Sequence, residues 1–131
     1  MLGDVIELSV VVRDLEAAIK HFETLFDLKV YQRSESKEFG FKNAILPLGK
    51  GHIELMQPTD PTKAVARFLE ERGEGVYLVG FEGGDISADT EKLREKGARV
   101  TLTGTDPPIA WVHPKDAHGV FVELRKTQEY E

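Results

Sequence analysis

The sequence predicts an α+β fold in which two β-α-β-β-β modules form one cupped, mixed sheet. An apolar strand followed by a helix with an aspartate at its N-cap occurs twice, and these aspartates, Asp14 and Asp85, are 85 − 14 = 71 positions apart. A strand that follows a glycine and carries a glutamate also occurs twice, with Glu54 and Glu123 separated by 123 − 54 = 69 positions. One module alone would leave a sheet edge unpaired, so we expect the copies to face each other and equivalent side chains to meet near a pseudo-twofold axis.

The first module is expected to occupy about residues 4–57. An apolar strand over residues 6–12 precedes a helix over residues 15–26, whose apolar residues recur at helical spacing and whose N-cap is Asp14. Three further strands complete the module, and a glycine-containing turn joins the last two. We expect them at residues 28–34, 41–49 and 51–58.

The second module is expected over about residues 75–126. A connecting helix over residues 61–72, opened by Asp60 and Pro61 and ended by Gly73, leads into it. The order of elements then repeats, with a strand at 76–82, a helix at 86–96 and strands at 98–103, 109–113 and 120–126. Because 131 residues with 40% hydrophobic content suffice for one ordinary core, residues 1–131 are predicted to form a single domain.

Composition excludes several classes of function. A formal net charge of -6 argues against nucleic-acid binding, since the phosphate backbone would be repelled. The absence of cysteine excludes disulfides and thiolate chemistry. The N-terminus lacks a basic and apolar leader, and no stretch approaches the roughly 20 apolar residues that cross a bilayer. We therefore expect a cytoplasmic protein with no membrane or nucleic-acid partner.

Alternation along the strands places the acidic residues on one face of the sheet. In the strand over residues 51–58, Glu54 shares its face with His52, and the intervening apolar residues face the helices. By the same register, Glu7 and Glu123 point away from their apolar neighbours. The sequence thus predicts three carboxylates directed into one cavity.

Three converging carboxylates can be accommodated in two ways. Either a hard divalent ion such as Mg²⁺, Mn²⁺ or Ca²⁺ binds Glu7, Glu54 and Glu123, with His52 as a further ligand, or no metal binds and hydrogen bonds hold the site. Without a cation, at least one of these carboxyl groups should have a raised pKa and keep its proton. Both alternatives stay open at this point.

Several longer phrases resemble the vicinal oxygen chelate superfamily, the glyoxalase, bleomycin resistance and dioxygenase group, and within it most closely the methylmalonyl-CoA epimerases. The resemblance implies a glyoxalase-like cup, a homodimer and a cavity that usually holds one divalent metal ion. Of the family's four ligand positions, two are matched by Glu54 and Glu123. The other two, at which the family has histidines, are occupied by Glu7 and Leu78. The phrases are RDLEAAIKHFETLFDLKV, ILPLGKGHIELMQPTDP, AVARFLEERGEGV, VHPK and GVFVELR.

The resemblance implies an epimerase, isomerase or lyase that removes a proton next to a carbonyl group of a small carbonyl compound or acyl thioester. Glu123 and then Glu54 are the expected catalytic carboxylates, and Lys115 is the expected contact of an acyl thioester's phosphates. Asn43 stands where a second base is sought, and Glu38 lies close to it in the sequence. The alternative is a non-catalytic small-molecule binding protein of the same fold, since half of the ligand positions are altered.

Overall fold

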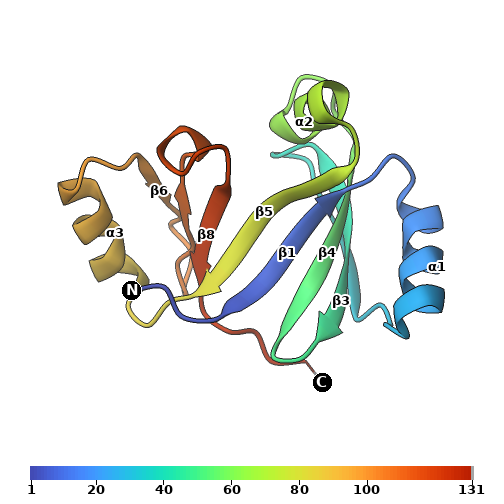
Figure 1. Ribbon diagram of the computed structural model, residues 1–131, viewed down its shortest axis with the longest axis horizontal. Coiled ribbons are helices and arrows are strands. Elements are labelled where there is room, and N and C mark those ends of the chain that lie inside the picture. Colours follow the sequence, from blue (N-terminus) through green and yellow to red (C-terminus); the bar gives the residue numbers. More distant parts are fainter. Residues whose placement is uncertain (131) are drawn as a thin grey trace.

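The computed structural model describes residues 1–130, which form one eight-stranded sheet with three α-helices and one short 3-10 helix (Figure 1). The elements are β1 (Val5–Val11), α1 (Leu15–Phe26), β2 (Gln32–Ser36), β3 (Phe41–Leu48), β4 (Gly51–Pro58), α2 (Ala64–Arg72), β5 (Gly75–Glu82), α3 (Ile86–Glu95), β6 (Val100–Leu102), β7 (Ala110–Val112), η1 (Pro114–Asp116) and β8 (Phe121–Arg125).

The strand order β2-β3-β4-β1-β5-β8-β7-β6 is symmetric about its centre. There β1 and β5 pair antiparallel, and each pairs in parallel with the last strand of its own module, β4 or β8. The remaining strands continue outward as antiparallel neighbours. This arrangement of two β-α-β-β-β modules in one curved mixed sheet confirms the predicted fold class.

The helices α1 and α3 begin at equivalent capping aspartates. The Asp14 carboxylate accepts a hydrogen bond of 3.1 Å from the backbone N–H of Ala17, and the Asp85 carboxylate accepts one of 3.0 Å from that of Ala88. Each bond satisfies a donor that the first helical turn leaves free. Figure 1 shows the two helices at opposite ends of the molecule, each on the outside of its own module.

Two cores lie under these helices. In the first module, Leu15 and Ile19 of α1 are buried against the sheet residues Ala44, Leu46 and Leu55. In the second, Ile86 of α3 is buried with Ala110 and Leu124. Burial of apolar side chains on this face leaves the other face of β4 and β8 for polar side chains, as the alternation predicted.

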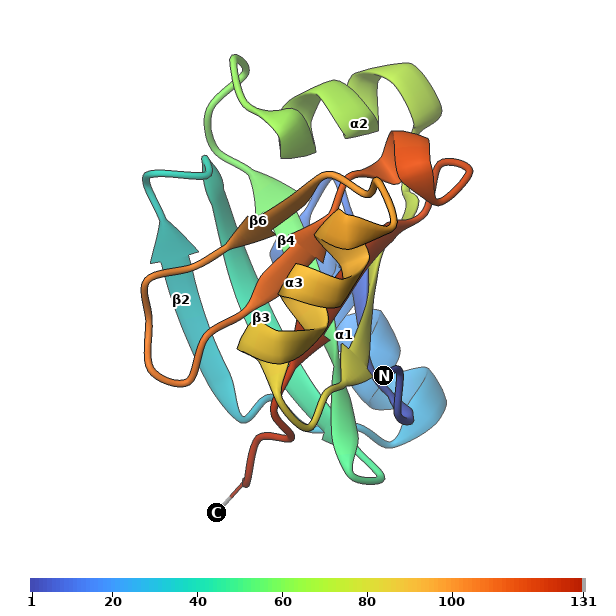
Figure 2. The same cartoon turned by 90° about the vertical axis from the view of Figure 1, so that its left-hand side faces the viewer.

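The helix α2 lies across one end of the strands, as Figure 2 shows. Its residue Val65 is buried with Val11 of β1 and Met56 of β4. The helix begins at Ala64, three residues later than predicted, because Asp60 instead accepts hydrogen bonds from the backbone N–H and hydroxyl of Thr62 in a preceding turn.

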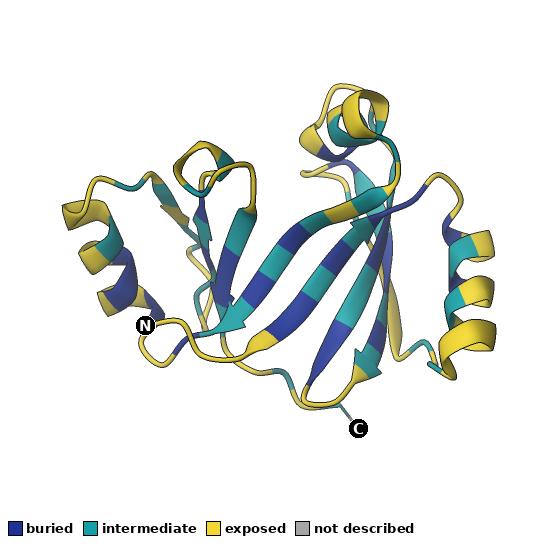
Figure 3. Cartoon of the chain, viewed as in Figure 1, coloured by how far each residue is buried: buried dark blue, intermediate teal, exposed yellow. Residues whose placement is uncertain are grey.

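The strand predicted over residues 28–34 also begins later, at Gln32. Leu28 and Val30 pack against the core under α1, so packing outweighs their strand propensity. Figure 3 shows burial concentrated in the strands and on the inner faces of the helices. Among residues 1–130, no helix has both the length and the apolar character that crossing a membrane requires.

Candidate functional site

A cavity of about 870 Å³ lies against the face of the sheet opposite α1 and α3. The three predicted carboxylates, Glu7, Glu54 and Glu123, line it together with His52, and residues of α2 close one end. Arg125, two residues after Glu123 and on the same face of β8, lines it as well.

Register brings four residues of the site into one row across the sheet. Glu7 on β1 pairs with His52 on β4 and with Gly80 on β5, and Gly80 in turn pairs with Glu123 on β8. A side chain on Gly80 would collide with the row, since a Cβ there would lie 2.7 Å from the Cβ of Glu7 and 3.5 Å from Oε2 of Glu123. Gly80 therefore provides the space in which Glu7 and Glu123 meet.

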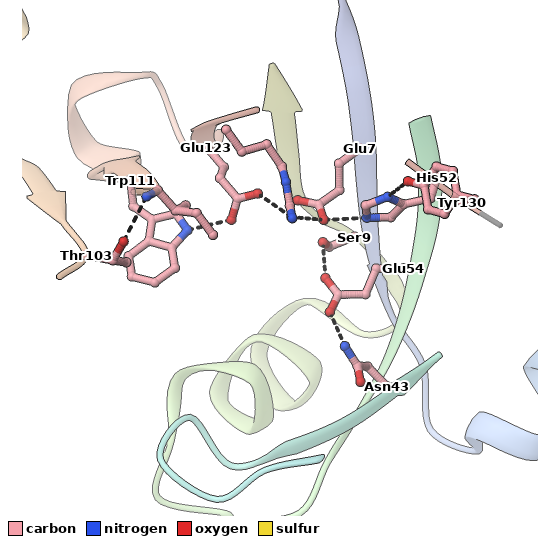
Figure 4. Close-up of polar contacts among 11 residues, drawn as sticks. Glu7, Ser9, Asn43, His52, Glu54, Thr103, Trp111, Glu123 and Tyr130 are labelled. Carbon is pink, nitrogen blue, oxygen red and sulfur yellow. Dashed lines mark hydrogen bonds and ion pairs between the residues drawn. The ribbon is translucent and has the colours of Figure 1, made fainter. Parts of the chain in front are cut away.

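His52 connects Glu7 to the C-terminal segment. Its Nε2 lies 2.6 Å from Oε2 of Glu7, and its Nδ1 bonds to the hydroxyl of Tyr130 (Figure 4). Burial, and next the positive charge of Arg125, lower the pKa of His52 to about 4. The ring is therefore neutral at pH 7, and the contact with Glu7 is a hydrogen bond donated by Nε2–H, with Nδ1 accepting from Tyr130.

Glu123 is held from two sides. The indole Nε1–H of Trp111 donates a hydrogen bond of 2.7 Å to Oε1, and Nη1 of Arg125 lies 3.3 Å from Oε2 (Figure 4 draws both contacts). The same Nη1 lies 3.0 Å from Oε2 of Glu7. One guanidinium nitrogen thus donates to both buried carboxyl groups.

The two carboxyl groups share less than two negative charges. Burial, together with the hydrogen bond to Glu7 and its charge, raises the pKa of Glu123 to about 8, and burial also raises the pKa of Glu7. Because Glu7 receives the shorter bond from Arg125 and the bond from His52, it is the ionised partner, and Glu123 keeps its proton at pH 7. The sequence predicted that, without a cation, at least one of the converging carboxyl groups would keep its proton.

Glu54 belongs to a separate hydrogen-bonded group in the same cavity. The Ser9 hydroxyl donates to its Oε1 at 2.6 Å, and Nδ2 of Asn43 donates to its Oε2 at 2.5 Å. The Ser34 hydroxyl in turn donates to Oδ1 of Asn43. Both oxygens of Glu54 therefore accept hydrogen bonds from uncharged side chains.

The residues in this arrangement do not fit a divalent metal ion. Oxygens of Glu54 and Glu123 that would face an ion already accept bonds from protein donors, and both ring nitrogens of His52 are engaged. A guanidinium group stands between Glu7 and Glu123, where it would repel a second cation. Within residues 1–130, no group of three or more histidine, aspartate or glutamate side chains is arranged to hold a metal.

The other positions singled out in the sequence lie as follows. Leu78, at the expected fourth ligand position, is buried on the cavity wall beside Ser9. Glu38 is exposed and lines the cavity, whereas Lys115 is exposed on η1 and lies outside the lining. The role of Lys115 as a phosphate contact stays a prediction.

Sequence reasoning missed four residues that shape the site. Arg125 and Gly80 could have been predicted, because residues two apart on a strand share a face. Arg125 lies two residues from Glu123, and Gly80 lies two residues from Leu78. For Trp111 the sequence carries no signal beyond a large aromatic residue on a strand, and nothing in the polar C-terminal segment points to Tyr130.

The chain is similar to known proteins of one superfamily, among them several acyl-coenzyme A epimerases. A sequence model described as the "Glyoxalase/Bleomycin resistance protein/Dioxygenase superfamily" matches residues 8–113. The chain is 30% identical to an ethylmalonyl-CoA/methylmalonyl-CoA epimerase of Cereibacter sphaeroides, with 96% of this chain and 99% of the relative aligned. It is 28% identical to the mitochondrial methylmalonyl-CoA epimerase of Homo sapiens, over 95% of this chain and 74% of the relative.

The chain is also similar in structure to solved methylmalonyl-CoA epimerases. A variant of the Streptomyces coelicolor methylmalonyl-CoA epimerase in complex with 2-nitronate-propionyl-CoA superposes with a TM-score of 0.89, at 27% identity, over 98% of this chain and 100% of that one. A methylmalonyl-CoA epimerase in complex with methylmalonyl-CoA and NH4+ also gives 0.89, at 28% identity, over 100% of this chain and 99% of that one.

Proposed function

Because the chain belongs to the glyoxalase/bleomycin resistance protein/dioxygenase superfamily, we propose that it is an epimerase acting on a 2-carboxyacyl coenzyme A thioester such as methylmalonyl-CoA. The observation that carries the proposal is the nearly full-length similarity, in sequence and in structure, to epimerases of that substrate class. The cavity supports it, since carboxyl groups and a cation line the same space.

The reaction needs a base, an acid and a positive charge. The C–H bond at carbon 2 breaks, its electron pair moves into an enolate of the thioester carbonyl, and the proton passes to an ionised carboxylate. A protonated carboxyl group then delivers a proton to the other face, and the carbonyl re-forms with inverted configuration. The positive charge stabilises the enolate oxygen.

Glu54 and Glu123 are our candidates for these two carboxyl groups. Glu54 serves as base, because its carboxyl group lines the cavity and is oriented through both oxygens by Ser9 and Asn43. Glu123 serves as acid, because its pKa is raised to about 8. In the reverse direction their roles exchange. Glu38 is a second candidate for the base, since its exposed carboxyl group lies on the cavity wall.

The direct test is exchange at carbon 2. Methylmalonyl-CoA carrying deuterium at that carbon is incubated with the protein in light water, and loss of deuterium is followed by NMR or mass spectrometry. We expect loss well above the rate in buffer and in heat-denatured protein. Folded protein that produces no such loss would rule out the epimerase function.

Non-catalytic binding is distinguished in the same samples. A thioester that raises the melting temperature binds the native state. Stabilisation without any deuterium loss would favour the alternative of a small-molecule binding protein, whereas stabilisation with exchange supports the epimerase. The homodimer implied by the family and the cytoplasmic location expected from the sequence stay predictions.

A further inference from the structure

Arg125 places a permanent positive charge at the point where the family-based expectation has a metal ion. Its Nη1 lies 3.0 Å from Oε2 of Glu7 and 3.3 Å from Oε2 of Glu123, and the side chain lines the cavity. Glu7 and Glu123 are two of the four residues that the sequence suggested as metal ligands. The guanidinium thus satisfies the carboxyl groups that an ion would otherwise have bridged.

One edge of the guanidinium is left without a protein partner. The Nε atom of Arg125 is buried and has no hydrogen-bond partner. Among residues 1–130, the hydrogen bonds of this side chain are made by Nη1, so the edge formed by Nε–H and an Nη2–H group is free. This side-on edge matches two oxygen atoms bound in parallel, and an unsatisfied buried donor is costly.

Duplication of the module does not account for Arg125. With the offset of 69 that relates β4 to β8, its counterpart is residue 125 − 69 = 56, Met56. With the offset of 71 that relates β1 to β5, the counterpart of Glu7 is residue 7 + 71 = 78, Leu78. An acid and a base have therefore been placed together at two positions whose counterparts in the other module are apolar, and they pair across 118 residues of sequence.

We propose that the Arg125 guanidinium is the resident cation of this site in place of a divalent metal ion, and that its free edge binds the two oxygens flanking carbon 2 of a 2-carboxyacyl thioester. One oxygen belongs to the free carboxylate and the other to the thioester carbonyl. When the proton leaves carbon 2, negative charge grows on the thioester oxygen, and the guanidinium stabilises it without transferring a proton. The binding of the two substrate oxygens rests on the proposed function, whereas the assignment of Arg125 as the resident cation does not.

The first test measures metal binding without any substrate. Wild-type protein purified without chelator should contain far less than one divalent ion per chain by inductively coupled plasma mass spectrometry, and its melting temperature should not change with EDTA or Mn²⁺. Arg125→Gln removes the charge and should bind Mn²⁺ at least tenfold more tightly. Arg99→Gln is the matched control, because it breaks an exposed pair with Asp116 and should leave Mn²⁺ binding unchanged.

The second test measures ligand selectivity by calorimetry with malonyl-CoA and acetyl-CoA, which differ by the carboxylate. Wild type should bind malonyl-CoA at least tenfold more tightly than acetyl-CoA, and Arg125→Gln should lose this preference. Arg125→Lys should keep only part of it, because a lysine ammonium group lacks the planar pair of N–H donors of a guanidinium group.

The outcomes separate the two proposals. A stoichiometric metal in wild type that Glu123→Ala loses, or Mn²⁺ binding no tighter in Arg125→Gln than in wild type, overturns the assignment of Arg125 as the resident cation. An unchanged malonyl-CoA preference in Arg125→Gln overturns the substrate contact. Neither result depends on deuterium exchange, whose absence would overturn the epimerase function alone.

Discussion

Gly80 and Glu7 lie opposite each other in the antiparallel β1–β5 pair, so close that a Cβ on Gly80 would be 2.7 Å from the Cβ of Glu7. An irregularity in the register between Val5 and Glu7 accompanies this approach. The missing side chain of Gly80 is therefore a requirement of the site, since any larger residue must displace Glu7 from its contacts with His52 and Arg125.

We expect Gly80→Ala to lower the free energy of unfolding by about 1–3 kcal/mol, the usual cost of overpacking a closely packed site. Deuterium exchange should fall as well, because Glu7 and Glu123 move. Gly84→Ala is the control, since nothing lies within 4 Å of a Cβ at that position. Urea denaturation measures both variants, and equal stabilities would show that the row tolerates a side chain at Gly80.

Glu123 should make the protein less stable as pH rises towards 8. Its pKa is about 8 in the folded protein against 4.5 for the free side chain, so between these values the folded state holds one proton more than the unfolded state. The contribution of Glu123 to the free energy of unfolding is therefore fully present below pH 4.5. Above that pH it falls by at most about 1.4 kcal/mol per pH unit.

The comparison of wild type with Glu123→Gln tests this between pH 6.5 and 8, above the range in which His52 contributes. Wild type should lose stability across this window in urea titrations, and the variant should lose clearly less because it has no proton to release. Parallel slopes in the two proteins would mean that Glu123 does not hold its proton in the folded state.

His52 should remain neutral down to pH 5. Its pKa is lowered to about 4 from a model-peptide value of 6.5, so it contributes stability that is present above 6.5 and lost as pH falls through 4. The imidazole resonances in ¹⁵N NMR should show Nε2–H as the tautomer and no titration between pH 8 and 5. Tyr130→Phe, which removes the donor to Nδ1, should weaken the tautomer preference.

Substitution of the two catalytic candidates should separate their roles from general damage. Glu54→Gln and Glu123→Gln should each slow deuterium exchange by about 10²–10⁴-fold, the range typical of a lost general base or acid. Glu35→Gln is the control, because Glu35 is exposed on β2 and outside the cavity lining. If only Glu38→Gln slows deuterium exchange, Glu38 is the base instead of Glu54.

A variant of Asn43, which donates a hydrogen bond to Glu54, tests how that carboxylate is oriented. Asn43→Ala removes one of the two donors to Glu54 and should slow exchange less than Glu54→Gln does, since Ser9 still orients the carboxylate. A melting temperature close to that of wild type would show that the effect comes from the site. An equal loss in both variants would mean that Asn43 itself takes part in the reaction.

Local features of the sequence determined most of the fold. The aspartates at the helix N-caps, the helical spacing of apolar residues and the twofold alternation along strands act over a few residues, so they predicted α1, α3 and the cavity face of Glu7, Glu54 and Glu123. The start of α2 and of β2 was predicted too early, because a turn at Asp60 and the packing of Leu28 override local preference.

Only the tertiary structure decided how the charges of the site are balanced. Arg125 reaches Glu7 across 118 residues of sequence, and Tyr130 reaches His52 across 78. Such contacts depend on sheet register and on the direction of long side chains, neither of which leaves a periodic pattern in the sequence. Burial then sets the protonation of Glu123 and His52, because the free energy of a charge depends on the surrounding solvent and neighbours and not on the residue type alone.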